Sequence, residues 1–147
     1  MTISAILRQK ARVGVAEIAR AAPSATIADV SDQLHRRRIG AVLVMDSTDQ
    51  LLGIVSERDI VASLAEQGAR TLDMTAAQLM TRDLHIATPS TTVAEAMEMM
   101  TTGRFRHLPV MDGDRLVGIV SIGDIVKARL SQQAQEVDSL KAYVAGG

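Results

Sequence analysis

Apolar residues recur at three- and four-residue intervals in two stretches of this chain, residues 27–34 and 93–100. Such spacing predicts amphipathic helices, because residues spaced in this way share one helical face. Thr26 and Thr92 precede the two stretches, and each has an acidic residue three positions later. This pattern is typical of the first turn of a helix. We therefore expect a helix to begin at each threonine and to bury its apolar face.

Two short apolar runs follow each predicted helix. The first pair covers residues 41–45 and 51–55, separated by the polar stretch 46–50, and the second pair covers residues 108–111 and 116–120. Short apolar runs on both sides of a polar turn are typical of β-hairpins with buried strands. The sequence therefore predicts one hairpin after each helix.

A second helix is expected after each hairpin, with apolar positions at residues 60–64 and 125–130. A short strand is expected before each first helix, over residues 17–21 and 84–87. Each half of the chain then has the order β-α-β-β-α. We expect an α/β (α+β) fold of two such repeats, packed on each other with pseudo-twofold symmetry because each is small for an independent core.

The two halves are also similar residue by residue. Residues 22–46 align with residues 88–112 at a constant offset of 66, and eight of these 25 positions are identical. Residues 51–64 align with residues 116–129, with eight identities in 14 positions. The internal repeat predicts a first domain, a second domain and a C-terminal helical tail, at residues 13–68, 80–135 and 136–147.

Composition excludes several classes of function. The chain has 16 basic and 17 acidic residues, a formal net charge of -1, one Phe, one Tyr and no Trp. It therefore lacks both the positive charge and the aromatic platforms that nucleic-acid binding uses. Cysteine is absent, which excludes disulfides and thiolate chemistry. With no apolar run of membrane-spanning length and no signal-like N-terminus, we expect a soluble cytoplasmic protein without a membrane partner.

No recognisable catalytic pattern is present in the sequence. His35, His85 and His107 have no nucleophile motif around them, and the glycine patterns of phosphate-binding loops and dinucleotide-binding turns are missing. A His-x-x-x-His pair for a metal is also missing. We therefore expect neither an enzyme nor a metal site.

Two motifs carry a resemblance to a known family. Gly-Ile-Val-Ser-x-x-Asp-Ile-Val occurs at residues 53–61 and 118–126, and Arg-His-Leu-Pro-Val-Met-Asp occupies residues 106–112. With the predicted order of elements, they resemble the CBS domain, and the tandem resembles a Bateman module. The resemblance implies a regulatory sensor that binds an adenosine-containing ligand, such as AMP, ADP, ATP or NAD, in clefts between the repeats. It also implies a homodimer, a downstream protein partner and no catalytic cofactor.

The repeated motif places Ser56 and Asp59, and likewise Ser121 and Asp124, where a strand leads into a helix. Unpaired backbone N–H groups and the positive end of the helix dipole favour an anion there. The resemblance implies that each serine faces a phosphate or ribose and that each aspartate accepts ribose hydroxyls. The same residues are typical helix caps, so a purely structural role stays open.

Four further residues complete the expected nucleotide-binding set. Arg106 and His107 lie beside the second motif and would complement a phosphate, although a solvated arginine and a hydrogen-bonded histidine would suit the fold equally well. Arg58 lies within the first motif, where an anionic partner would offset a cation at a helix start. Ile86 belongs to the strand expected before the second repeat's first helix.

The two clefts are expected to be unequal. The second repeat has Arg106 and His107 near its motif, where the first repeat has Gly40 and Ala41. A phosphate therefore meets more charged donors near Asp124 than near the corresponding residue of the first repeat.

A different class of function also fits the sequence, namely a structural dimerisation or interaction module without ligand function. The C-terminal tail predicts self-association, because Val137, Leu140 and Val144 recur with helical spacing. A homodimer is expected on either hypothesis, since closed twofold symmetry is the commonest arrangement of homo-oligomers.

Overall fold

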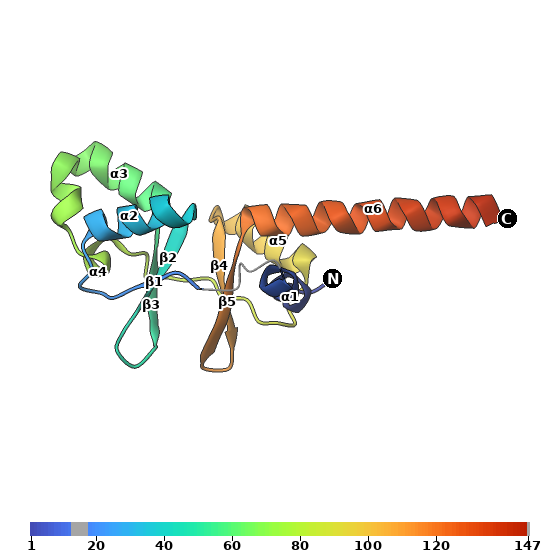
Figure 1. Ribbon diagram of the computed structural model, residues 1–147, viewed down its shortest axis with the longest axis horizontal. Coiled ribbons are helices and arrows are strands. Elements are labelled where there is room, and N and C mark those ends of the chain that lie inside the picture. Colours follow the sequence, from blue (N-terminus) through green and yellow to red (C-terminus); the bar gives the residue numbers. More distant parts are fainter. Residues whose placement is uncertain (13–17, 147) are drawn as a thin grey trace. The chain divides into compact units, whose positions relative to one another are not determined.

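The computed structural model describes residues 1–12 and 18–146, which divide into two compact units. One unit consists of residues 18–84. The other joins the N-terminal residues 1–12 to residues 85–146. Each unit contains the helix, hairpin and helix of one sequence repeat (Figure 1), and the N-terminal segment packs with the second repeat.

The unit of residues 18–84 contains a three-stranded sheet in the order β1-β2-β3. β1 is parallel to β2, and β2 is antiparallel to β3. The strands are β1 (Arg20–Ala21), β2 (Ala41–Met45) and β3 (Leu51–Ser56). The helices are α2 (Ile27–Arg37), α3 (Glu57–Gln67), a 3-10 helix (Gly68–Asp73) and α4 (Ala76–Leu79). The predicted hairpin and both predicted helices of this repeat are confirmed.

The unit that includes the N-terminus has a two-stranded antiparallel sheet, β4 (His107–Asp112) and β5 (Arg115–Ser121). Its helices are α1 (Ile3–Arg12), α5 (Val93–Gly103) and α6 (Ile122–Gly146). The mixed α+β class is therefore confirmed. Across residues 1–12 and 18–146, no helix combines the length and the apolar character that a bilayer crossing requires.

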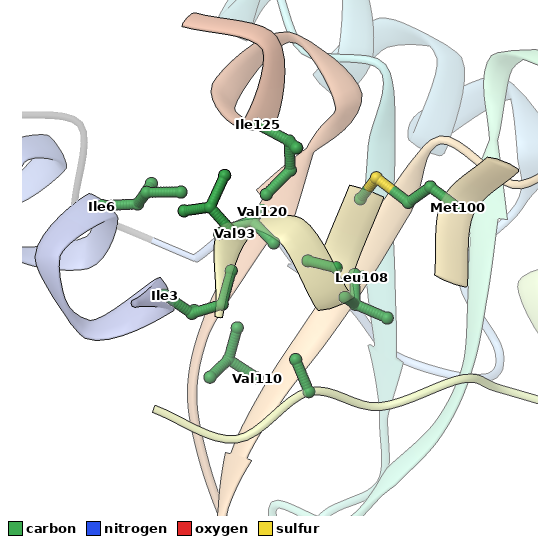
Figure 2. Packing of buried hydrophobic residues seen from close by; sticks show 10 residues of the cluster. Ile3, Ile6, Val93, Met100, Leu108, Val110, Val120 and Ile125 are labelled. Atoms are coloured by element: carbon green, nitrogen blue, oxygen red, sulfur yellow. The ribbon is translucent and has the colours of Figure 1, made fainter. Parts of the chain in front are cut away.

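Each unit has an aliphatic core of its own. In the unit that includes the N-terminus, three helices and the hairpin contribute buried side chains (Figure 2). The residues labelled there are Ile3, Ile6, Val93, Met100, Leu108, Val110, Val120 and Ile125. The other core includes Ile27, Val30 and Leu34 of α2, so the apolar face predicted from the helical spacing is confirmed.

The strand expected over residues 84–87 does not form, and this prediction was wrong. Only Ala87 pairs, through an isolated parallel bridge to β4. Pro109 of β4 has no N–H, so it cannot extend this pairing toward the N-terminal side of Ala87. At the matching place in the other unit, the Leu43 N–H donates to the Ala19 carbonyl at 3.0 Å, and β1 forms.

The strand expected over residues 17–21 is shorter than predicted. β1 covers only Arg20–Ala21, and Glu17 lies outside the described residues. The predicted helix starts are confirmed, because the Thr26 and Thr92 hydroxyls each accept a hydrogen bond from the backbone N–H three residues later, at 3.2 and 3.0 Å. These bonds satisfy backbone donors that the first helical turn leaves unpaired.

Candidate functional site

The start of α6 brings together the serine and the aspartate that the second motif predicts. The Ser121 hydroxyl accepts a hydrogen bond from the Asp124 N–H at 3.1 Å, and Asp124 Oδ2 accepts one from the Ser121 N–H at 2.8 Å. β5 ends at Ser121 and α6 begins at the next residue, so these bonds satisfy backbone donors at the helix start. The pair therefore caps the helix, whatever else it binds.

α3 starts in the same way. The Ser56 hydroxyl accepts a hydrogen bond from the Asp59 N–H at 3.3 Å, and Asp59 Oδ2 accepts one from the Ser56 N–H at 2.9 Å. The two residues form a reciprocal capping box. The structural role left open by the sequence is thus present in both repeats, and any difference between the two aspartates must come from their other contacts.

A lysine from α1 distinguishes the two aspartates. Lys10 Nζ lies 3.0 Å from Asp124 Oδ2 and donates a second hydrogen bond to the Ile119 carbonyl at 2.9 Å. The Lys10 and Asp124 side chains are only 20% and 25% exposed, so the ion pair is partly shielded from water. Within the described part of the chain, Asp59 has no ion pair.

α1 corresponds to α4 of the other unit but is longer, and its additional length brings it to Asp124. The Ile3 N–H of α1 donates to the Thr91 carbonyl at 2.8 Å, and the Ala76 N–H of α4 donates to the Ala25 carbonyl at 2.7 Å. The two helices therefore begin against equivalent turns of their own repeats. α4 has four residues and α1 has ten, and the additional turns of α1 carry the lysine that meets the carboxylate.

A groove of about 520 Å³ runs along α1 and α6 beside this ion pair. Among the described residues, its charged side chains are four cations and one carboxylate, namely Arg8, Lys10, Arg12, Lys127 and Asp124. Of these cations, only Lys10 is in an ion pair among the residues that the structure describes. The excess of positive charge gives the groove a potential that favours an anion.

The hairpin places Arg106 and His107 beside the same helix start. His107 is paired with Ser121 across β4 and β5, and the Ile122 N–H donates to the Arg106 carbonyl at 2.8 Å. The Arg106 side chain is exposed, whereas His107 is half-buried. In the other unit, Ala41 occupies the position that corresponds to His107 and is buried in the strand. The side chains beside the two helix starts therefore differ, and the unequal ligand binding predicted from the sequence stays a prediction.

Arg58 and Ile86 were also expected to contact nucleotide. Arg58 is exposed in the first turn of α3, one residue before Asp59. Ile86 is 45% exposed and lies just before the isolated bridge of Ala87. Neither residue lines the groove along α1 and α6. Among the residues described, no group of three His, Cys, Asp or Glu side chains could hold a metal ion.

Comparison with known proteins identifies the family of this chain. The sequence model of the CBS domain matches this chain twice, at residues 15–66 and 76–131. The chain belongs to the CBS domain family. A curated relative, the mitochondrial CBS domain-containing protein CBSX3 of Arabidopsis thaliana, is 32% identical over 150 residues, which cover 99% of this chain and 73% of the relative.

Solved CBS structures have the same fold. The CBS-domain protein ATU1752 of Agrobacterium tumefaciens is 39% identical, with a TM-score of 0.82 over 87% of this chain and 92% of that protein. The CBS domain protein PAE2072 of Pyrobaculum aerophilum, solved in complex with AMP, is 25% identical, with a TM-score of 0.72 over 84% of this chain and 89% of that protein.

Sequence reasoning missed the contribution of α1 to the second CBS repeat. This contribution could have been predicted from a Met-Thr pair. The pair occurs at Met1 and Thr2 and again at Met74 and Thr75 before α4. The Met1 carbonyl accepts a hydrogen bond from the Val93 N–H at the start of α5 at 3.0 Å, and the Met74 carbonyl accepts one from the Ile27 N–H at the start of α2 at 2.8 Å. An alignment of these two pairs would have predicted that the N-terminal segment completes a CBS unit.

Proposed function

We propose that this chain is a regulatory CBS pair that binds an adenosine-containing ligand, with Asp124 as the ribose-binding carboxylate. One observation carries the proposal: among the residues that the structure describes, Asp124 is the single carboxylate in a groove whose other charged side chains are those of Arg8, Lys10, Arg12 and Lys127. A hydroxyl acceptor beside several cations suits a ligand that has both a ribose and phosphates. CBS pairs are generally regulatory modules without catalysis, which agrees with this role.

The carboxylate of Asp124 retains capacity for a ligand. Within the described residues, the Ser121 N–H and Lys10 Nζ both donate to its Oδ2 atom. Oδ1 is therefore available to accept a ribose hydroxyl. The cap and the lysine hold the carboxylate in one orientation, so little side-chain freedom is lost when a hydroxyl binds.

The phosphate part of the ligand would meet the cations of the groove. Arginine and lysine form short, charge-assisted hydrogen bonds with phosphate oxygens. His107 begins β4 opposite Ser121, and Arg106 precedes it. Both residues lie outside the lining of the groove and would add donors from the hairpin. The relative from Pyrobaculum aerophilum was solved with AMP, which supports an adenosine nucleotide. AMP, ADP, ATP and NAD share the ribose and phosphate groups on which this proposal depends.

The second candidate function is a structural dimerisation or interaction module, and the apolar side chains exposed along α6 favour it. We propose that the chain forms a homodimer in either case and that a ligand-bound state is transmitted to a downstream protein. The cytoplasmic location stays a prediction from the sequence.

Mass spectrometry of small molecules released from the denatured protein tests the ligand. We expect an adenosine-containing compound from the wild-type chain and from Asp59→Ala, and at least tenfold less from Asp124→Ala, since a charged hydrogen bond contributes about 1.5–3 kcal/mol. The melting temperature of each variant, freed of ligand, shows whether the lost cap has affected folding. If the wild-type chain releases no such compound and AMP, ATP and NAD leave its melting temperature unchanged, the second candidate function is favoured.

A further inference from the structure

One face of α6 remains exposed beyond the core of its unit. Figure 1 shows the C-terminal half of this helix extending past the other elements of that unit. Besides Tyr143, which is 80% exposed, five large aliphatic side chains on α6 are between 43% and 69% exposed. They are Val126, Leu130, Val137, Leu140 and Val144. Exposed apolar residues that gather on one face of a helix need a partner to cover them.

The spacing of these residues is that of a coiled coil. They lie four, seven, three and four residues apart, which fits a heptad with Leu130, Val137 and Val144 at position a and Val126 and Leu140 at position d. The remaining d position is Gln133. A heptad repeat keeps a seam facing a second helix along the whole contact. Valine at a with leucine at d, as at Val137, Leu140 and Val144, favours two parallel strands, whereas Val126 and Leu130 have the reverse arrangement.

We propose that residues 126–144 of α6 form a parallel, two-stranded coiled coil with the same helix of a second copy of this chain. The inference rests on the proposed homodimer and names its contact surface and its orientation. The face opposite the seam carries Ser131, Gln135 and Ser139, which are polar and exposed and suit a surface that remains in water.

The charges beside the seam favour the parallel orientation. Glu136 occupies position g and Lys141 occupies position e of the following heptad. In a parallel pair, a g residue lies beside the e residue five positions later on the other helix, so each Glu136 meets the Lys141 of the other copy. An antiparallel pair would place like charges together. Neither residue is in an ion pair within the described part of the chain.

Disulfide cross-linking tests the orientation, because the chain has no cysteine of its own. Leu130→Cys and Val144→Cys each introduce a single thiol at an a position, about 21 Å apart along the helix. In a parallel, in-register pair, each thiol faces its own counterpart at a distance that suits a disulfide. In an antiparallel pair, a positions face d positions, so position 130 faces position 140 and position 144 faces position 126, and neither variant links to itself. Ser139→Cys, on the polar face of the same helix, is the matched control.

A mixing experiment tests the charge pair. Glu136→Lys and Lys141→Glu each create like-charge contacts in their own homodimer, whereas a heterodimer of the two variants has opposite charges at both contacts. With one variant carrying a mass tag, native mass spectrometry should show several-fold more heterodimer than either homodimer, beyond the statistical ratio. The wild-type chain mixed with its own tagged form should give the statistical ratio.

The outcomes separate this inference from the proposals on which it rests. About tenfold more linked dimer from both Leu130→Cys and Val144→Cys than from Ser139→Cys supports the parallel coiled coil. A dimer in light scattering that links at neither position overturns the inference and leaves the homodimer intact. A monomer at micromolar concentration overturns both. Nucleotide binding is measured separately and is not affected by any of these results.

Discussion

At the scale of single residues, Asp124 is held by two donors of different origin. The Ser121 N–H belongs to the same helix start, and Lys10 Nζ comes from a helix 114 residues earlier in the chain. Because both bonds go to Oδ2 and the ion pair is partly shielded from water, the lysine contributes to stability as well as to the orientation of the carboxylate.

Lys10→Met should therefore lower the free energy of unfolding by about 1 kcal/mol, since it removes a partly shielded ion pair and retains most of the apolar stem. Lys127→Met is the matched control, because Lys127 lines the same groove without an ion pair in the described chain, and its change should stay within about 0.5 kcal/mol. Urea unfolding measures both values. Equal effects of the two variants would contradict the role assigned to Lys10.

The sequence predicts the bonds between Ser121 and Asp124 but not the ion pair between Lys10 and Asp124. Ser121 and Asp124 are three residues apart, so their mutual hydrogen bonds follow from the geometry of a helix start. Lys10 meets Asp124 only because α1 packs against the second repeat. Such a contact depends on tertiary structure, which the local pattern of a single sequence does not contain.

At the scale of elements, α1 and α4 occupy equivalent places in their units. α1 in one unit and the residues after α4 in the other each approach a glycine of the neighbouring strand. A Cβ atom at Gly53 would lie 2.7 Å from Met80 Sδ and from the Thr81 carbonyl oxygen. A Cβ atom at Gly118 would lie 2.6 Å from Leu7 Cδ2. Both strands therefore need glycine for close contact with the segment that completes their unit.

Gly53→Ala should cost more stability than Gly118→Ala, although the two positions are equivalent in the repeats. The flexible end of Leu7 can rotate away from a new methyl group, whereas the Thr81 carbonyl is fixed by its hydrogen bond from the Ile54 N–H at 3.1 Å. We expect losses of about 2–3 and about 1 kcal/mol, respectively, in urea unfolding. A larger loss for Gly118→Ala would show that α1 is packed more rigidly than the segment after α4.

The sequence predicts those helices and strands that depend on local residue patterns. Both hairpins and the helices that begin at Thr26 and Thr92 follow from apolar periodicity and from polar residues at turns and caps. The strand expected before the first helix of the second repeat, over residues 84–87, does not form because Pro109 cannot donate a hydrogen bond. An alignment of the two repeats therefore predicts the same strand in both halves only where neither half has a proline in place of a residue whose N–H pairs the strands.

At the scale of the whole molecule, duplication has produced two CBS units with similar folds and different charges. The sequence predicts this inequality from Arg106 and His107 in one repeat against Gly40 and Ala41 in the other. The structure adds the cations of α1, which α4 is too short to match. An anionic ligand should therefore prefer the unit of Asp124, and at 100 times its dissociation constant it should stabilise the fold by about 2.7 kcal/mol.

Calorimetric titration of AMP, ATP and NAD into the wild-type chain, Asp124→Ala and Asp59→Ala tests the central claim most directly. We predict that at least one nucleotide binds the wild-type chain, that Asp124→Ala weakens its binding by about tenfold or more, and that Asp59→Ala leaves it largely intact. Melting temperatures without ligand separate a lost contact from a lost helix cap. Wild-type affinity in a folded Asp124→Ala variant, or no binding of any of the three nucleotides at millimolar concentration, would contradict the account.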